Sequence, residues 1–234
     1  MATGIDPFIV EALFKYSGRD MGFIAKTVHL SPSVFEELVD SIPYVEVVDG
    51  KLVIRDRLRL ALYFLEKGVS VKRLSRYLDW SDFEKMSAEI LGRHGYVVAS
   101  NVLFTRPRRL EIDVVGVDTG CGRAVVIDCK HWRHGISPSS IIEHGRRHID
   151  RTMKFLRYRS WLYSRYPYFS KVRYAVPVLV TFTTPRLRSV DNRVLVVSIS
   201  ELNNLLQDLH LVLEEMSVKP MSVEEVVRDR IFGD

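Results

Sequence analysis

Apolar residues in the first 80 positions follow helical spacing, interrupted by one stretch of strand-like alternation. They recur every three or four residues in 6–17, in 21–30 and from Ser31 onwards, which predicts three helices. Two alternating runs then flank Asp49-Gly50, a dipeptide typical of a tight β-hairpin turn. Helical spacing resumes afterwards, so we expect a mainly helical domain over these positions.

Beyond residue 80 the pattern changes to β-branched apolar runs that alternate with helical spacing. The predicted strands lie at 97–104, 111–117, 124–127, 174–183 and 193–199. The predicted helices lie at 82–94, 137–164 and 223–231 and in a segment capped by Ser200. Pro177 within one strand predicts a sheet edge or a bulge. The pattern predicts three parts: domain 1–80, an α/β domain at 81–216 and a helical tail at 217–234.

One of these apolar strands ends in charged residues. The run 124–127 leads directly into Asp128-Cys129-Lys130, and buried charges are costly unless they are paired or bind a metal. Asp113 lies on the preceding strand, and a hairpin can bring it beside Asp128. Two carboxylates and a lysine at one sheet edge can hold a divalent cation and a water molecule. The alternative is an exposed strand end with a surface ion pair.

Asp113 followed by Asp128-Cys129-Lys130 resembles the PD-(D/E)XK signature of restriction-endonuclease-like nucleases. The helix-strand-strand-strand order around these residues is that family's core, and the resemblance covers roughly 81–213. The layout is most similar to archaeal Holliday-junction resolvases and to the nuclease domains of type IV restriction enzymes. It implies a restriction-endonuclease-like mixed central sheet flanked by helices. The helices and hairpin of 1–80 resemble a winged helix-turn-helix domain.

By this resemblance, we expect a metal-dependent DNA endonuclease that uses Mg²⁺ or Mn²⁺. The implied metal ligands are the side chains of Glu89, Asp113 and Asp128 and the backbone carbonyl of Cys129. Glu84 is the alternative to Glu89 as the third acidic ligand. Lys130 is expected to orient or deprotonate the attacking water, or to neutralise charge on the scissile phosphate. Two neighbouring carboxylates keep a lysine charged, which favours the orienting role.

Many relatives in this family carry a glutamine on the helix after the lysine. No glutamine precedes Gln207 here, so we expect His144 or His148 in that place. This departure supports an alternative function, in which an inactive nuclease fold serves as a DNA-binding or protein-docking module.

The composition favours a polyanionic partner. The 234 residues carry a formal net charge of +5, and arginine supplies 24 of the 34 basic residues. Arginine suits bidentate phosphate contacts. The residues expected to bind nucleic acid lie near the acidic motif: Arg106, Arg108, Arg109, His131, Arg133, Arg146, Arg147, Arg151 and Lys154. A thermophile surface is the alternative explanation, because Asn and Gln together total only five.

The third predicted helix argues against DNA reading by the N-terminal domain. Its residues 33–40 include Glu36, Glu37 and Asp40 and no Arg or Lys, so this helix would repel phosphates. Packing or protein contact is therefore at least as well supported as DNA binding for this domain.

The sequence also sets an expected location and assembly. No apolar run reaches transmembrane length, and no signal-peptide pattern is present, so we expect a cytoplasmic protein without a membrane partner. Two cysteines are too few for a disulfide scaffold. Cutting both strands of DNA requires two sites, so we expect a homodimer.

Overall fold

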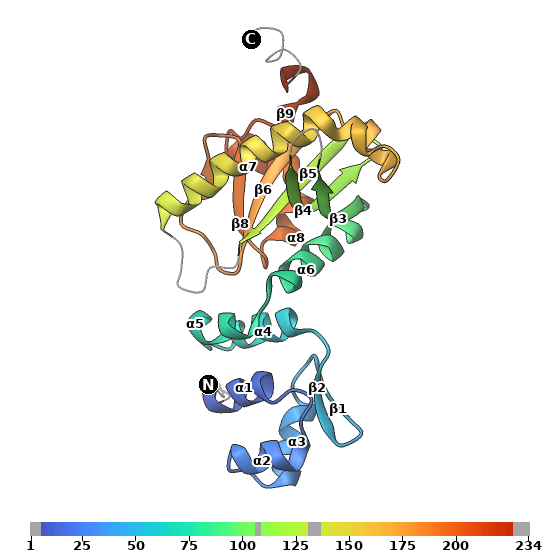
Figure 1. Ribbon diagram of the computed structural model, residues 1–234. Helices are drawn as coiled ribbons and strands as arrows, with labels where there is room; N and C mark the ends of the chain where they lie inside the picture. The colour runs from blue at the N-terminus through green and yellow to red at the C-terminus, as the bar shows by residue number, and fades with distance from the viewer. Residues whose placement is uncertain (1–5, 106–108, 131–136, 227–234) are drawn as a thin grey trace. The chain divides into compact units, whose positions relative to one another are not determined.

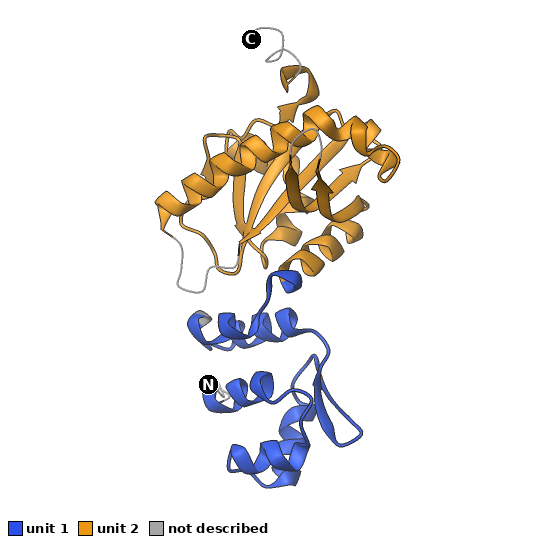
Figure 2. Cartoon of the chain, in the orientation of Figure 1, with its two compact units in different colours: residues 1–82 blue, residues 83–234 orange. Residues whose placement is uncertain are grey.

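The computed structural model describes residues 6–105, 109–130 and 137–226. The chain divides into two compact units, residues 1–82 and residues 83–234 (Figure 2). Each unit has its own buried apolar core, so we describe the two separately.

Unit 1 contains the helices and the hairpin that its sequence predicts. In chain order they are α1 (Pro7–Lys15), α2 (Met21–Thr27), α3 (Pro32–Asp40), β1 (Val45–Val48), β2 (Lys51–Ile54), α4 (Arg57–Glu66) and α5 (Val71–Leu74). The side chains of Asp6, Asp20, Ser31 and Asp56 each accept a backbone N–H at the start of a helix. Asp49 and Gly50 both have positive φ, as a two-residue turn between β1 and β2 requires.

Two details of unit 1 differ from the sequence prediction. The second helix ends at Thr27 and not at Leu30, because His29 adopts a left-handed conformation with φ of 57°. The N–H of Leu30 then bonds back to the carbonyl of Ala25, which closes the helix end. Val34 of α3 lies at a position that the helical spacing of apolar residues would place inward, yet it is 49% exposed. The interpretation of this unit as a winged helix stays a prediction.

In the part of the chain that the structure describes, seven strands of unit 2 form one sheet (Figure 1). They are β3 (Val97–Phe104), β4 (Leu110–Asp118), β5 (Arg123–Lys130), β6 (Tyr174–Thr181), β7 (Ser189–Val190), β8 (Val194–Ser198) and β9 (Met221–Ser222). The order is β3-β4-β5-β6-β8-β7, and β9 pairs with β6. Pairing is antiparallel from β3 to β5 and parallel from β5 to β8. The predicted mixed sheet is confirmed.

Helices cover both faces of this sheet. They are α6 (Trp80–Arg93), α7 (Pro138–Tyr158), α8 (Leu202–Gln207) and α9 (Leu209–Glu215). Helix α7 crosses one face, and α6 and α8 lie on the other (Figure 1). Phe155 and Leu156 of α7 belong to the same buried cluster as Val126 of β5, and burying each such side chain contributes about 1.5–3 kcal/mol. This packing holds α7 against the strand that carries the acidic motif.

Pro177 lies in an interior strand, so the prediction of a sheet edge or bulge is wrong. Strand β6 pairs with β5 in an unbroken register, with Pro177 opposite Val126. On its other side β9 pairs with Tyr174 and Ala175, and β8 pairs from Val178 onwards. Pro177 falls in the gap between these two partners, where its missing N–H costs no ladder hydrogen bond on that side.

The long basic helix is shorter than predicted. Helix α7 ends at Tyr158, and 3₁₀ turns follow at Arg159–Leu162 and Pro167–Lys171. The Arg159 guanidinium donates to the carbonyl oxygens of Leu156 and Val172. It thereby satisfies a carbonyl of the last helical turn and ends the helix.

The C-terminal helices also differ from the prediction. The segment after Ser200 forms two short helices, and Glu201 instead of Ser200 occupies the position before the first of them. The Glu201 carboxylate accepts the N–H of Ser198 and pairs with Arg188. Ser222 accepts the N–H of Glu225 at 3.0 Å, as predicted for a helix at 223–231, although residues 227–231 of that helix lie outside the described part of the chain.

The turn between β4 and β5 generates a prediction about stability. Gly122 has φ of +79°, and a Cβ there would lie 2.8 Å from the backbone oxygen of Lys171. We therefore expect Gly122→Ala to lower the free energy of unfolding by about 2–3 kcal/mol, since it combines backbone strain with a clash. Urea unfolding measures this change. Gly120→Ala, two residues earlier in the same turn, is the matched control. Equal stability of the two variants would contradict the prediction.

Candidate active site

The pairing of β4 with β5 brings the two predicted aspartates together. Val114 lies opposite Ile127 and Val115 opposite Val126, so the next pair along the strands is Asp113 and Asp128. The backbone N–H of Cys129 donates to Asp113 Oδ2 at 2.7 Å. This bond orients the Asp113 carboxylate at the end of the ladder, where both acids reach the same edge of the sheet.

Asp128 is a buried carboxylate held by two cations. Only 2% of the residue is exposed. Lys130 Nζ lies 2.7 Å from Asp128 Oδ2, and the guanidinium of Arg151, on α7, contacts Oδ1. Without such partners a carboxylate at this depth would be strongly destabilising.

The two carboxyl groups have opposite pKa shifts. Burial, and next the negative charge of Asp128, raise the pKa of Asp113 from its usual 3.8 to about 6. Burial also disfavours ionisation of Asp128, but Lys130 and Arg151 outweigh it and hold the pKa of Asp128 below its usual value. Asp128 therefore stays ionised at neutral pH, whereas the ionisation of Asp113 depends on the pH and on nearby charges.

A hydrogen bond from the buried side chain of His148 holds α7 against β5 beside this pair of aspartates. His148 Nε2 lies 2.9 Å from the carbonyl oxygen of Val126, so this nitrogen carries the proton and donates. Burial lowers the pKa of His148, which keeps the ring neutral. His148 lies one helical turn before Arg151 and so fixes the position from which Arg151 reaches Asp128. His144, the other histidine considered, is half-buried, and the charge of Lys130 contributes to lowering its pKa.

The structure does not bring Glu89 into this cluster. Glu89 forms an ion pair with Arg93 one turn along α6, and its side chain is 41% exposed. The charge of Glu84 contributes to the raised pKa of Asp113, which indicates that Glu84 lies nearer to Asp113 than Glu89 does. Burial also raises the pKa of Glu84 itself, while a hydrogen bond from Asn101 opposes that shift. Of the two acids on α6 that the sequence singles out, Glu84 is therefore the one whose charge acts on Asp113.

Asp113 and Asp128 line a cleft of about 360 Å³ whose walls are mainly basic. Its lining residues are Arg109, Leu110, Glu111, Asp113, Asp128, Lys130, Arg151 and Lys154. Four of these residues are basic and three are acidic, so the cleft carries a small excess of positive charge. Of the residues expected to bind nucleic acid, Arg109, Arg151 and Lys154 belong to the wall.

The other residues expected to bind nucleic acid are not part of that wall. Arg146 pairs with Asp191 at 2.9 Å, and Arg147 pairs with Glu143 at 2.5 Å. Both pairs are well exposed and therefore weak. Arg106, Arg108, His131 and Arg133 lie outside the described residues.

The donor atoms at this edge fit a magnesium ion. In the part of the chain that the structure describes, no three acidic, histidine or cysteine side chains are grouped as a complete metal cage. Mg²⁺ does not need one, because it commonly binds through one or two carboxylates together with water and substrate phosphate. Asp113, Asp128 and the carbonyl of Cys129 offer only hard oxygen atoms. The mutual repulsion that raises the pKa of Asp113 would be relieved by a divalent cation between the acids.

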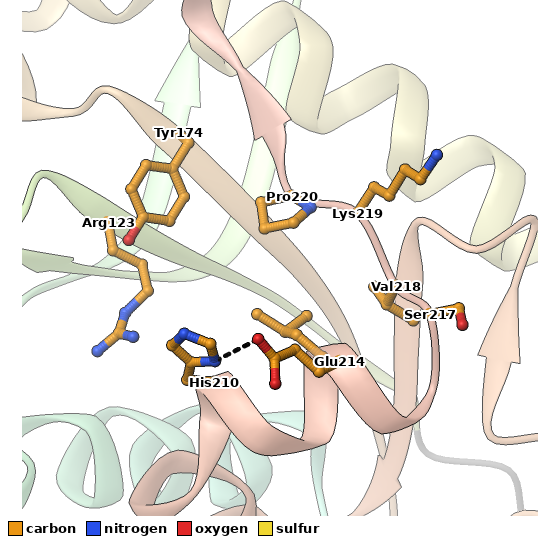
Figure 3. Close-up of a pocket in the computed structure, with 9 residues that line it drawn as sticks. Arg123, Tyr174, His210, Glu214, Ser217, Val218, Lys219 and Pro220 are labelled. Atoms are coloured by element: carbon orange, nitrogen blue, oxygen red, sulfur yellow. Dashed lines mark ion pairs between the residues drawn. The ribbon is translucent and has the colours of Figure 1, made fainter.

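A larger pocket of about 520 Å³ lies elsewhere in unit 2 (Figure 3). Arg123 and Tyr174, at the starting ends of β5 and β6, contribute to its lining. It is therefore remote from Asp128 and Lys130, at the finishing end of β5. Its acid, Glu214, pairs with His210 at 3.5 Å (Figure 3). The smaller, polar cleft carries the acid pair and the lysine, so we place the active site there.

Three supporting contacts escaped the sequence analysis. Ser87 Oγ lies 3.6 Å from the buried thiol of Cys129, Asn101 bonds to Glu84, and Arg151 binds Asp128, although the sequence suggested for it only a contact with nucleic acid. Each contact joins segments far apart in the sequence. For Arg151, the only signal in the sequence was its spacing of three residues from His148, which places both side chains on one face of a helix.

Comparisons with known proteins support a restriction-endonuclease-like fold for this part of the chain. Residues 75–151 match the family model Mrr_cat, which describes a restriction endonuclease. The crystal structure of protein VC1899 from Vibrio cholerae aligns with 92% of this chain and 53% of its own, at 14% identity and a TM-score of 0.33. The chain thus spans about half of that protein's length. No curated protein gave a match.

The raised pKa of Asp113 generates a prediction about pH. Between pH 4 and pH 6 the unfolded chain releases this proton, whereas the folded protein retains it. The metal-free wild type should therefore lose stability relative to Asp113→Asn as the pH rises through this window, by about 3 kcal/mol at pH 8. Urea unfolding in EDTA across pH 4–8 measures the difference.

Asp118→Asn is the control for that measurement. Hydrogen bonding from Cys121 lowers the pKa of Asp118 below its usual 3.8, so its stabilising contribution is lost only below about pH 4, and the stability difference between this variant and the wild type should stay nearly constant across pH 4–8. A pH-independent difference between the wild type and Asp113→Asn would contradict the assignment.

Proposed function

We propose that the protein is a Mg²⁺-dependent DNA endonuclease, on the premise that residues 75–151 match the model of a restriction endonuclease domain of the PD-(D/E)XK superfamily. The observation that carries the proposal is the grouping of Asp113, Asp128 and Lys130 at one edge of the sheet, inside a basic cleft. A buried acid pair serves no evident packing purpose, whereas a nuclease that uses a metal requires it.

The chain's own residues would divide the work as follows. Asp113, Asp128 and the Cys129 carbonyl hold the Mg²⁺ ion, with Glu84 as the additional acid. The bound ion lowers the pKa of a water molecule and stabilises the negative charge that develops on the phosphate. Lys130, already 2.7 Å from Asp128, orients that water or neutralises charge on the scissile phosphate. The buried position of the acids limits competing bulk water.

Charge is divided between the two units in a way that supports DNA binding by unit 2. Unit 1 contains 11 basic and 12 acidic residues, whereas unit 2 contains 23 basic and 17 acidic residues. Phosphate contacts dominate the affinity of most DNA-binding proteins. We therefore assign backbone binding to the cleft of unit 2. Helix α3 of unit 1, with exposed Glu36, Glu37 and Asp40, is unsuited to contact with phosphates.

Further properties follow from the proposal. Hydrolysis of both strands of a duplex calls for two copies of the cleft, which a homodimer supplies.

None of the described helices is long and apolar enough to cross a membrane.

Cleavage assays test the proposal directly. We expect the wild type to cut labelled DNA in the presence of Mg²⁺ or Mn²⁺, in a panel of duplex, single-stranded, flap and four-way-junction substrates. Asp128→Asn and Lys130→Met should lower the rate by at least about 10²-fold, because each removes an electrostatic element of the site. Asp150→Asn changes an exposed acid on α7 and is the control, and melting curves verify folding.

If the wild type binds DNA but cuts no substrate with either metal, the nuclease proposal fails. The non-catalytic DNA-binding module then becomes the better description.

A second comparison identifies the third acid. Glu84→Gln should raise the Mg²⁺ concentration needed for half-maximal cleavage by about 10–100-fold, as for other groups that tune a metal site. Glu89→Gln should change that concentration by no more than about twofold, because Glu89 is 41% exposed and its ion pair with Arg93 is a surface pair. The reverse ranking in the same Mg²⁺ titration would assign the role to Glu89.

A further inference from the structure

The contact between Arg151 and Asp128 creates a conflict within the proposed site. Asp128 Oδ1 is a candidate ligand atom for the metal, yet the Arg151 guanidinium occupies it. Lys130 lies on the other oxygen, Oδ2. A divalent cation bound at Oδ1 would meet the positive charge of Arg151 at contact distance, and like charges in a poorly solvated site repel strongly. Either Arg151 or Lys130 must therefore release Asp128 before a metal ion can bind there.

Arg151 is the cation that is free to move. Its side chain is 32% exposed, whereas that of Lys130 is 9% exposed. Arg151 also extends from α7 across to β5, whereas Lys130 lies two residues from Asp128 on the same strand. A rotation about the Arg151 side-chain bonds can therefore release Asp128 without disturbing the sheet.

The cleft offers Arg151 a second partner. Arg151, Arg109 and Lys154 line the same cleft, and a DNA phosphate would enter between them. A guanidinium binds phosphate and carboxylate with the same two-pronged geometry. Arg151 can therefore exchange the carboxylate of Asp128 for a phosphate without losing a charged partner.

We propose that Arg151 is an ionic latch that couples metal loading to DNA binding. Without DNA it holds Asp128 and weakens metal binding. With DNA it moves to a backbone phosphate and leaves Asp128 Oδ1 to the metal. Coupling of this kind is reciprocal, so metal also tightens DNA binding by the same factor. The inference rests on the proposed function and adds to it that the metal site is completed only on the substrate.

Calcium titrations of the full chain test the latch without relying on activity. Isothermal calorimetry measures Ca²⁺ affinity with and without a saturating DNA duplex, and a gel confirms that the DNA stays intact. For the wild type, we expect DNA to tighten Ca²⁺ binding about tenfold, within the usual range of coupling between two sites. For Arg151→Ala, we expect Ca²⁺ to bind about tenfold more tightly than to the wild type without DNA, with most of the DNA effect lost.

Two further variants separate the latch from a general charge effect. Lys154→Ala removes one positive charge from the same cleft, and among the described residues Lys154 forms no ion pair with Asp128. It should retain the tightening by DNA. Arg151→Lys keeps the charge and should also retain most of the coupling. Arg151→Gln replaces Arg151→Ala if melting curves show that the alanine variant is unfolded.

The outcomes distinguish the latch from the function beneath it. Ca²⁺ binding that DNA does not change, or equal effects of Arg151→Ala and Lys154→Ala, would overturn the latch and leave a metal-dependent nuclease intact. If no variant binds Ca²⁺, Mg²⁺ or Mn²⁺, with or without DNA, the metal-dependent function itself is overturned.

Discussion

Two carboxylates lie side by side at the edge of a buried sheet, and their repulsion is the constraint around which unit 2 is organised. Asp113 receives a backbone N–H from Cys129, and Asp128 is held between Lys130 and Arg151. These contacts offset the cost of burying negative charge. They do so incompletely, since the pKa of Asp113 remains raised to about 6. A further positive charge beside Asp113 would therefore stabilise its ionised form.

The fold supplies these compensating groups from three separate elements. The β4–β5 ladder sets the two aspartates opposite each other. Helix α7, packed through Phe155 and Leu156, delivers Arg151 to one face of β5. Helix α6 approaches the other face, where Ser87 contacts Cys129, and carries Glu84 toward the acids. A rigid apolar sheet thus holds charged groups within contact distance, as a pre-organised site requires.

In the proposed latch, the charges that stabilise the metal-free site would also control metal binding to it. A cation on Asp128 is needed while no metal is bound, because an unpaired carboxylate at that depth would be costly. That cation must then leave for the metal to enter. A mobile arginine meets both requirements, since carboxylate and phosphate suit its guanidinium equally well. A nuclease built this way would hold its metal firmly only when substrate is present.

The sequence by itself determined most of the elements and the position of the acidic motif. Apolar periodicity located most helices and strands of both units, and Asp128-Cys129-Lys130 after an apolar run marked the site. These signals are local, so neighbouring residues suffice to read them. Only the tertiary structure decided which acid of α6 influences the pKa of Asp113, that Arg151 binds Asp128, and that Pro177 lies in an interior strand. Each of these depends on contacts between distant segments, whose geometry packing sets and local spacing does not record.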